Sequence, residues 1–331
     1  MGTCFFRSPL ALHLQAFMDI RLASGRQGRS DRKLLSALDR FLMSDLKPGG
    51  TITREVAARY VDSTAHLSVN TRRNRMSVLR GFCLYLHHFD PRTCLIHRSF
   101  FPPRTRLAPH IYSSEEIQGI MAATKGIGPR GSLRPAVICT LVGLLVSTGV
   151  RIGEALKLTL ADVDLRKGLL LIRESKFKKS RYVPLSPSAS RHLAAFLRRR
   201  RKAGFAADPA APVFVNPEGR PYGHPRVCSV FLEILRDLGL RGPKGQRGPR
   251  VHDLRHTFAV NRLLAWYQTG DEIWAKLPLL STYMGHVTVT GTEIYLHATA
   301  ELMDQANRRF HSHFAIPPFR REEGSNDGPR D

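Results

Sequence analysis

The stretch LLSTYMGHVTVTGTEIYLH, residues 279–297, places His286 directly after a Met-Gly pair and Tyr295 nine residues further on. Met-Gly is read as a turn that ends an apolar segment. Most tyrosines are partly buried packing residues whose hydroxyl finds some partner. The stretch by itself therefore leaves Tyr295 open between a packing residue and a chemical group, and the rest of the chain has to decide.

Arg151 and Glu154 lie three residues apart after a Ser-Thr-Gly turn. If a helix begins near Arg151, the two side chains share one face, and the carboxylate can hold the guanidinium at a fixed angle. The remaining donors can then bind a phosphate oxygen. A simple ion pair within one helix is the alternative. The glycine, which lets a backbone approach closely, favours the functional interpretation.

The segment His252-Asp-Leu-Arg-His256 places His252 and Arg255 on one face of a predicted helix N-terminus, where anions are favoured. His252 and His256 also have the spacing of a metal-binding pair. The sequence offers no His-Glu-x-x-His pattern and no third ligand at a usual spacing, so phosphate chemistry is preferred. His256 alone is interpreted as a packed or capping histidine.

These segments, with the Lys-rich turn Lys176-Phe-Lys-Lys-Ser-Arg181 between them, occur in the order Arg, Lys, His-x-x-Arg, Gly-His, Tyr. This ordered set resembles the tyrosine recombinase (phage integrase) family, most of all integrases carried by transposons and plasmids. The resemblance implies cleavage and rejoining of DNA strands through a 3′-phosphotyrosyl intermediate, without metal or cofactor. The implied catalytic residues are Arg151, Lys176, His252, Arg255, His286 and the nucleophile Tyr295, supported by Glu154.

In this resemblance Tyr295 attacks the phosphodiester, His252 is the general acid–base, and Lys176 protonates the departing 5′-oxygen. Arg151, Arg255 and His286 would stabilise the charge on the phosphate oxygens. The family often has glycines beside its hairpin lysine, whereas Phe177 and Lys178 stand here, so Lys178 remains an alternative to Lys176.

The charge balance favours a polyanionic partner. The 331 residues carry 51 Lys+Arg against 27 Asp+Glu, a formal charge of +24, with 42% hydrophobic residues. Each phosphate that Lys or Arg neutralises releases condensed counterions, which favours nucleic acid over a membrane surface. No apolar run is long enough to cross a bilayer, and no signal peptide is recognised. Five scattered cysteines suggest a reducing compartment. We expect a cytoplasmic, nucleoid-associated protein.

Apolar periodicity predicts a mainly α protein with a small antiparallel β-sheet (α+β). The predicted parts are an N-terminal helical core-binding domain at 1–92, a Pro- and Arg-containing linker at 93–110, a catalytic domain at 111–317 and a disordered tail at 318–331. Val213-Phe-Val215 is predicted to be a short strand. Basic residues expected to contact double-stranded DNA are Arg73, Arg80, Arg104, Arg106, Lys178, Lys179 and Arg181.

The resemblance further implies a homotetramer on two duplexes of a specific recombination site, with or without other recombinases of the same element. Two other functions stay open. One is a type IB topoisomerase, which shares the chemistry but relaxes supercoils without exchanging strands between duplexes. The other is a catalytically silent DNA-binding accessory protein, which every filled active-site position argues against. Whether the reaction is integration, excision, resolution or inversion is not encoded in these motifs.

Overall fold

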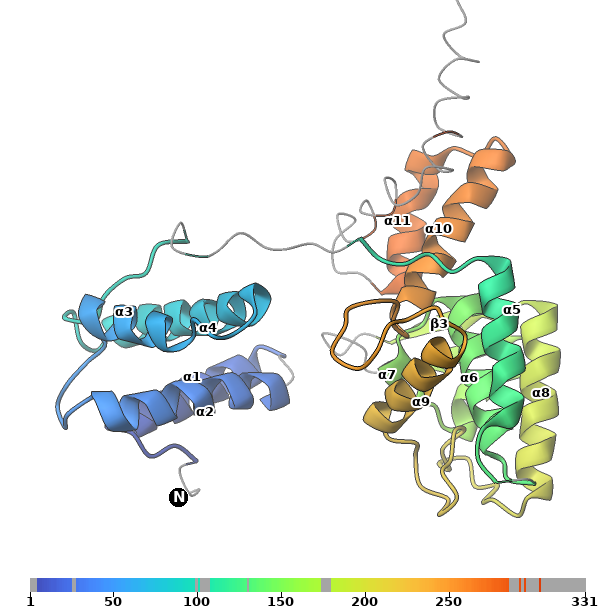
Figure 1. The fold of residues 1–331 in the computed structure, drawn as a ribbon, viewed down its shortest axis with the longest axis horizontal. Coiled ribbons are helices and arrows are strands. Elements are labelled where there is room, and N and C mark those ends of the chain that lie inside the picture. Colours follow the sequence, from blue (N-terminus) through green and yellow to red (C-terminus); the bar gives the residue numbers. More distant parts are fainter. Residues whose placement is uncertain are drawn as a thin grey trace, which may run out of the picture. The chain divides into compact units, whose positions relative to one another are not determined.

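The computed structural model describes residues 5–25, 28–98, 101, 108–129, 131–173, 180–285, 292, 295 and 304. The chain divides into two compact units, with the boundary between Leu107 and Ala108 (Figure 1). None of the helices within the described ranges is both long and apolar enough to cross a membrane.

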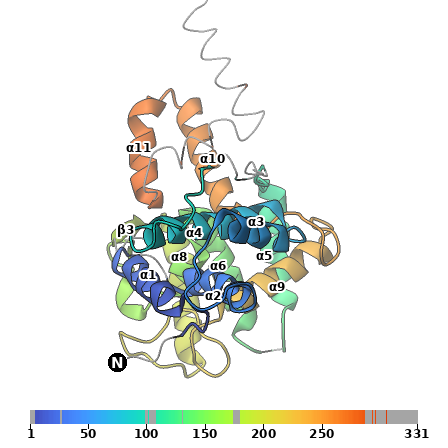
Figure 2. The same ribbon diagram turned by 90° about the vertical axis from the view of Figure 1, so that its left-hand side faces the viewer.

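The described residues of the first unit form the helices α1 (Ala11–Ala23), α2 (Gly28–Asp45), α3 (Arg54–Ser63) and α4 (Val69–His87) (Figure 2). The apolar stripes of the sequence form its core, including Leu14 of α1, Leu38 of α2 and Leu79 of α4. The side chains of Thr53 and Ser68 accept hydrogen bonds from the first turns of α3 and α4, as expected for N-caps. The predicted helical character of this unit is confirmed.

The segment after α4 remains packed on the first unit. The hydroxyls of Thr51 and Thr93 are 2.6 Å apart, and the Cys94 amide donates to the Ile52 carbonyl at 2.8 Å. Thr93 is buried, and Arg80 Nε donates to the carbonyl of Ile96 at 3.0 Å. Residues 93–96 thus belong to the helical unit, although the sequence places the start of the linker at 93.

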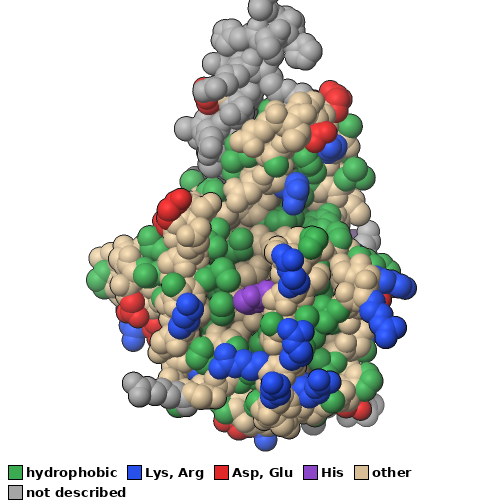
Figure 3. All heavy atoms as spheres, turned by 90° about the vertical axis from the view of Figure 1, so that its right-hand side faces the viewer, with side chains coloured by type: hydrophobic (Ala, Val, Ile, Leu, Met, Phe, Trp, Pro, Cys, Tyr) green, Lys and Arg blue, Asp and Glu red, His purple; other side chains and the backbone are tan. Residues whose placement is uncertain are grey.

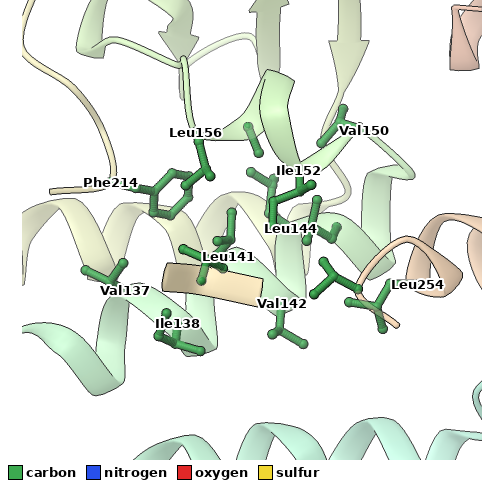
Figure 4. Close-up of a cluster of buried hydrophobic side chains, with 14 of the residues drawn as sticks. Val137, Ile138, Leu141, Val142, Leu144, Val150, Ile152, Leu156, Phe214 and Leu254 are labelled. Carbon is green, nitrogen blue, oxygen red and sulfur yellow. The ribbon is translucent and has the colours of Figure 1, made fainter. Parts of the chain in front are cut away.

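The second unit is built around one buried helix, α6 (Arg134–Thr148). It is apolar on all sides, and its side chains pack against residues of several other elements, among them Leu156, Phe214 and Leu254 (Figure 4). The other helices in the described part of this unit are α5 (Ser114–Ala123), the one-turn α7 (Ile152–Ala155), α8 (Pro187–Lys202), α9 (His224–Asp237), α10 (Asp253–Gln268) and α11 (Ile273–Met284).

A three-stranded antiparallel sheet has the order β1 (Val163–Asp164), β2 (Leu169–Ile172), β3 (Arg181–Pro184). The pairing places Leu170 opposite Val183 and Ile172 opposite Arg181. Side chains alternate between the faces of a strand, so Arg181 shares a face with the buried Val183. The predicted sheet is confirmed, and the Lys-rich turn between β2 and β3 lies outside the described residues.

The predicted strand at Val213–Val215 is wrong. These residues are buried, but they form no named strand: Val215 makes an isolated bridge with Pro221, and the preceding Pro212 makes one with Thr159. The Val213 amide bonds the Leu158 carbonyl, and the Tyr222 amide bonds the Phe214 carbonyl. Apolar β-branched residues therefore serve here as a core-facing connection, which local sequence does not distinguish from a strand.

Helices α10 and α11 lie side by side (Figures 1 and 2). They share an apolar cluster with Phe258 and Leu263 from α10, Leu277 and Leu280 from α11, and the ring of Tyr295. α11 ends at Gly285, whose φ of 69° is the left-handed conformation that glycine adopts at helix C-termini. The predicted Met-Gly turn is confirmed, and it brings the end of α11 to the helices that carry the candidate site.

Candidate active site

Arg151 lies at the junction between α6 and α7. α6 ends at Gly149 with a φ of 62°, and a Cβ there would lie 2.3 Å from the ring of Phe258, so the turn requires glycine. Arg151 is the N-cap of α7, and its Nη1 donates to Glu154 Oε1 at 2.7 Å. Its Nη2 donates to the carbonyl of Gly285 at 2.9 Å. The helix that fixes Arg151 is a single turn.

Arg255 projects from α10 into the interior and is 2% exposed. Its Nη1 donates to the Gly149 carbonyl and its Nη2 to the Met284 carbonyl, both at 2.6 Å. Burial, and then the positive charge of Arg151, lower the pKa of Arg255 to about 10. The guanidinium therefore stays protonated at neutral pH, as a buried cation close to a second one. Such a pair favours an anion between them.

Glu154 connects Arg151 to the sheet. Arg181 Nη2 donates to its Oε2 at 2.8 Å, while Arg151 donates to it through both Nη1 and the backbone amide. Burial alone would raise the pKa of Glu154, but the hydrogen bonds and charges of Arg181 and Arg151 outweigh it and hold the pKa at about 2. The carboxylate is thus ionised at all physiological pH values and orients both guanidiniums.

His252 and His256 form an edge-to-face ring pair at the start of α10, with centroids 4.8 Å apart. His252 keeps an exposed edge, yet its packed surroundings and then the charge of Arg255 lower its pKa. Burial, followed by the charge of His252, lowers the pKa of His256 to about 4. Both imidazoles are therefore neutral at pH 7 and can accept a hydrogen bond.

Tyr295 is 2% exposed, with its ring in the apolar cluster of α10 and α11. Its hydroxyl does not point into that cluster: it lies 3.1 Å from His256 Nδ1 and feels the charges of Arg255 and Arg151. Burial raises the pKa of the phenol, and the charges of Arg255 and Arg151 oppose this rise. The hydroxyl therefore lies among the cationic and imidazole groups, although it is far from them in sequence.

The structure brings together five of the seven residues predicted for catalysis and its support: Arg151, Glu154, His252, Arg255 and Tyr295. Lys176 and His286 lie outside the described residues. Two guanidiniums, two neutral imidazoles and a phenol can bind an anion, accept a proton and provide a nucleophile. Within the described part of the chain, no group of three or more His, Cys, Asp or Glu residues could hold a metal ion.

The sequence interpretation gave His256 a packing or capping role and did not include it in the site. In the structure its ring lies between His252 and Tyr295, with the centroids of His256 and Tyr295 5.3 Å apart. The i, i+4 spacing of the two histidines indicated that they share a face. His256 and Tyr295 are 39 positions apart in the sequence, so no local pattern predicts their contact.

The basic residues predicted to contact DNA lie in different settings. Arg73 lies over the ring of Phe101 at 5.7 Å, and Arg80 is half-buried against the Ile96 carbonyl. Arg181 faces the interior with a side chain 12% exposed. Other Lys and Arg side chains gather over the lower part of the face seen in Figure 3, with few Asp or Glu among them. Outside the described residues lie Arg104, Arg106, Lys178 and Lys179.

Comparison with known proteins assigns the family. The sequence model of the phage integrase family matches residues 111–301. The putative integrase/recombinase y4rB of Sinorhizobium fredii is 36% identical over 301 residues, which cover 89% of this chain and 95% of that protein. Tyrosine recombinase XerC of Lacticaseibacillus casei is 30% identical over 247 residues, 72% of this chain and 76% of that protein. The chain belongs to the tyrosine recombinase (phage integrase) family.

A solved structure of the Tn1549 transposon integrase, in complex with transposon right-end DNA, shares the fold. Its TM-score is 0.65 at 17% sequence identity, covering 92% of this chain and 99% of that one. The mainly α architecture with a small antiparallel sheet is therefore the architecture of this family.

Proposed function

We propose that this protein is a site-specific DNA recombinase that cleaves and rejoins strands through a 3′-phosphotyrosyl intermediate, as expected for a transposon- or plasmid-borne integrase. The observation that carries the proposal is the hydroxyl of Tyr295, which lies 3.1 Å from His256 Nδ1 and close enough to Arg255 and Arg151 for both charges to act on it. Double-stranded DNA is the partner, in keeping with a net charge of +24. An enzyme with this substrate would act in the cytoplasm, at the nucleoid.

In the proposed reaction the phenolic oxygen of Tyr295 attacks phosphorus and the bond from phosphorus to the 5′-oxygen breaks. The departing 5′-oxygen takes its proton from Lys176, and the phenol gives its proton to the imidazole pair. Arg151 and Arg255 stabilise the charge that develops on the non-bridging oxygens, with His286 as a further donor. The energy of the cleaved bond is kept in the phosphotyrosine, so attack by a 5′-hydroxyl of another strand rejoins DNA without a nucleotide cofactor.

His256 and His252 have different roles in taking up the proton of the phenol. His256 is neutral at neutral pH because its pKa is lowered, and in the tautomer that carries its proton on Nε2 it accepts the hydrogen bond of the phenol at Nδ1. His252 is in ring contact with His256 and exposed on its other edge, so it is the group that exchanges protons with the DNA site. His252 therefore remains the proposed general acid–base.

The family assignment also motivates a proposal about assembly: four protomers on two DNA duplexes, alone or with other recombinases of the same element. We expect a mixture of two differently labelled duplexes, taken from DNA flanking the gene, to yield recombinant products that carry one label on each arm. Relaxation of supercoiled DNA without such products would instead identify a type IB topoisomerase. Binding without either reaction would identify an accessory protein.

Replacing His256 by Ala should slow formation of the covalent adduct on a nicked suicide substrate by about tenfold, the worth of one hydrogen bond to the nucleophile. His256→Asn should recover most of this loss, because the Asn amide oxygen can take the place of Nδ1. Single-turnover rates measured at equal, saturating protein concentration test this. Equal rates for Ala and wild type would remove His256 from the mechanism.

The pH dependence of stability gives His256 an independent readout. Its folded-state pKa of about 4 lies below the ordinary value of 6.5, so the unfolded chain binds the extra proton first as the pH falls. The free energy of unfolding should therefore decrease as the pH is lowered from about 6.5 to about 4, and His256→Asn should show a shallower decrease. Identical slopes in urea titrations would contradict the buried neutral state.

A further inference from the structure

Three consecutive backbone carbonyls at the end of α11 each accept a hydrogen bond from a different arginine. Arg181 Nε donates to the carbonyl of Tyr283 at 2.7 Å. Arg255 Nη2 donates to Met284 at 2.6 Å, and Arg151 Nη2 donates to Gly285 at 2.9 Å. The arginines come from β3, α10 and the N-cap of α7, so this carbonyl triplet (residues 283–285) joins three separate elements.

The chemistry of a helix end explains why cations gather there. The last carbonyls of an α-helix have no partner within the helix and carry the negative end of its dipole. Gly285 makes the approach possible, because a Cβ at this position would lie 3.0 Å from Arg181 Nη1.

Arg181 differs from the other two arginines in what its remaining nitrogens bind. Nη2 donates to Glu154 Oε2 at 2.8 Å, and Nη1 reaches Oε1 at 3.3 Å. Each of its three nitrogens therefore already has a protein acceptor. With a side chain only 12% exposed, Arg181 is a poor candidate for a phosphate contact, in contrast to the expectation from the sequence.

We propose that Arg181 is a positioning residue of the recombination site and does not contact DNA. It acts through Glu154, which holds the guanidinium of Arg151, and through the Tyr283 carbonyl, which anchors the end of α11. Loss of Arg181 would leave Glu154 with one cationic partner and allow Arg151 and Gly285 to move. The inference rests on the proposed function, because the groups it positions are the proposed catalytic ones.

The test uses the full-length protein with Arg181→Met and Arg181→Lys. Adduct formation in a single turnover should fall about 10- to 100-fold in both, the size expected for lost hydrogen bonds to charged groups. Lys does not restore the rate. A planar guanidinium can donate to both Glu154 oxygens and to the Tyr283 carbonyl at once, whereas one ammonium group cannot reach all three in this geometry. Arg173→Met is the control, since Arg173 directly follows β2, pairs with Asp162 and has a side chain that is 58% exposed.

The salt dependence of DNA binding separates positioning from contact. A lost phosphate contact lowers the slope of log Kobs against log salt by about 0.9. The proposal expects Arg181→Met to keep the wild-type slope while cleavage falls. A slope reduced by that amount, with cleavage falling only as binding falls, or a rate restored by Lys, would overturn it.

A readout without DNA keeps the inference distinguishable from the proposed function. In the free protein, NMR titration should find the Glu154 carboxyl at a pKa of about 2 in the wild type and clearly raised in Arg181→Lys. If the wild type forms no adduct with any DNA, the proposed function fails, and this titration still decides whether Arg181 holds Glu154. An unchanged pKa in the variant would refute the positioning role.

Discussion

Tyr295→Phe should abolish the covalent protein–DNA adduct completely while DNA affinity stays within about twofold of wild type. The substitution removes one oxygen, and the ring can keep its place in the apolar cluster of α10 and α11. Losing a hydroxyl that is hydrogen-bonded to His256 should cost only about 1 kcal/mol of stability. Cleavage has no other attacking group in the proposal, so its loss is total. Denaturing gels of trapped complexes on a nicked substrate measure it.

Tyr283→Phe provides the matched control. Tyr283 is a partly buried tyrosine of the second unit, stacked on Phe258, and burial raises the pKa of its phenol to about 12. It should form the adduct at nearly the wild-type rate, because Arg181 is bonded to its backbone carbonyl and not to its hydroxyl. Persistence of the adduct in Tyr295→Phe, or its loss in Tyr283→Phe, would mean that the nucleophile is elsewhere.

Arg151→Ala should reduce the single-turnover rate of cleavage by about a hundred- to a thousandfold, the usual effect of losing one preorganised donor to a developing oxyanion. Binding should weaken far less, because many other basic residues contribute to a net charge of +24. The protein should remain folded, since Glu154 keeps its two hydrogen bonds from Arg181. Cleavage rates and equilibrium binding on the same substrate give the comparison.

Arg255→Ala belongs to the same prediction but is a less selective variant. Its removal would leave the carbonyls of Gly149 and Met284 without their arginine donor inside the protein, so thermal stability should fall together with cleavage. The side chain of Arg151 is 29% exposed, so Arg151→Ala separates the loss of cleavage from the loss of stability better than Arg255→Ala does. Equal losses in cleavage and binding for Arg151→Ala would make it a docking residue.

Much of the candidate site could be predicted from local sequence patterns. The spacing of Arg151 and Glu154 and of His252 and Arg255 is a property of single turns of chain, and the structure keeps both pairs. The caps Thr53, Ser68 and Ser113 follow from side chains that reach their own helix. Interactions between residues that are about four or fewer positions apart can be predicted directly from the sequence.

Contacts between distant segments were not accessible in this way. A basic residue in a Lys-rich turn suggests a DNA contact, yet the register of β3 turns Arg181 inward, on the face of Val183. The alternation of a strand could have indicated this, because Arg181 stands two residues before a buried valine. The partners of Arg181 and His256, Tyr283 and Tyr295, depend on how α11 and the chain beyond it pack, which no motif encodes.

The most direct test of the account is the identity of the amino acid bound to DNA. Wild-type protein trapped on a nicked substrate would be digested with nuclease and trypsin, and the nucleotide-bearing peptide sequenced by mass spectrometry. We expect a 3′-phosphate ester on the phenolic oxygen of Tyr295. A nucleotide on any other residue, or a 5′-phosphate linkage, would contradict it.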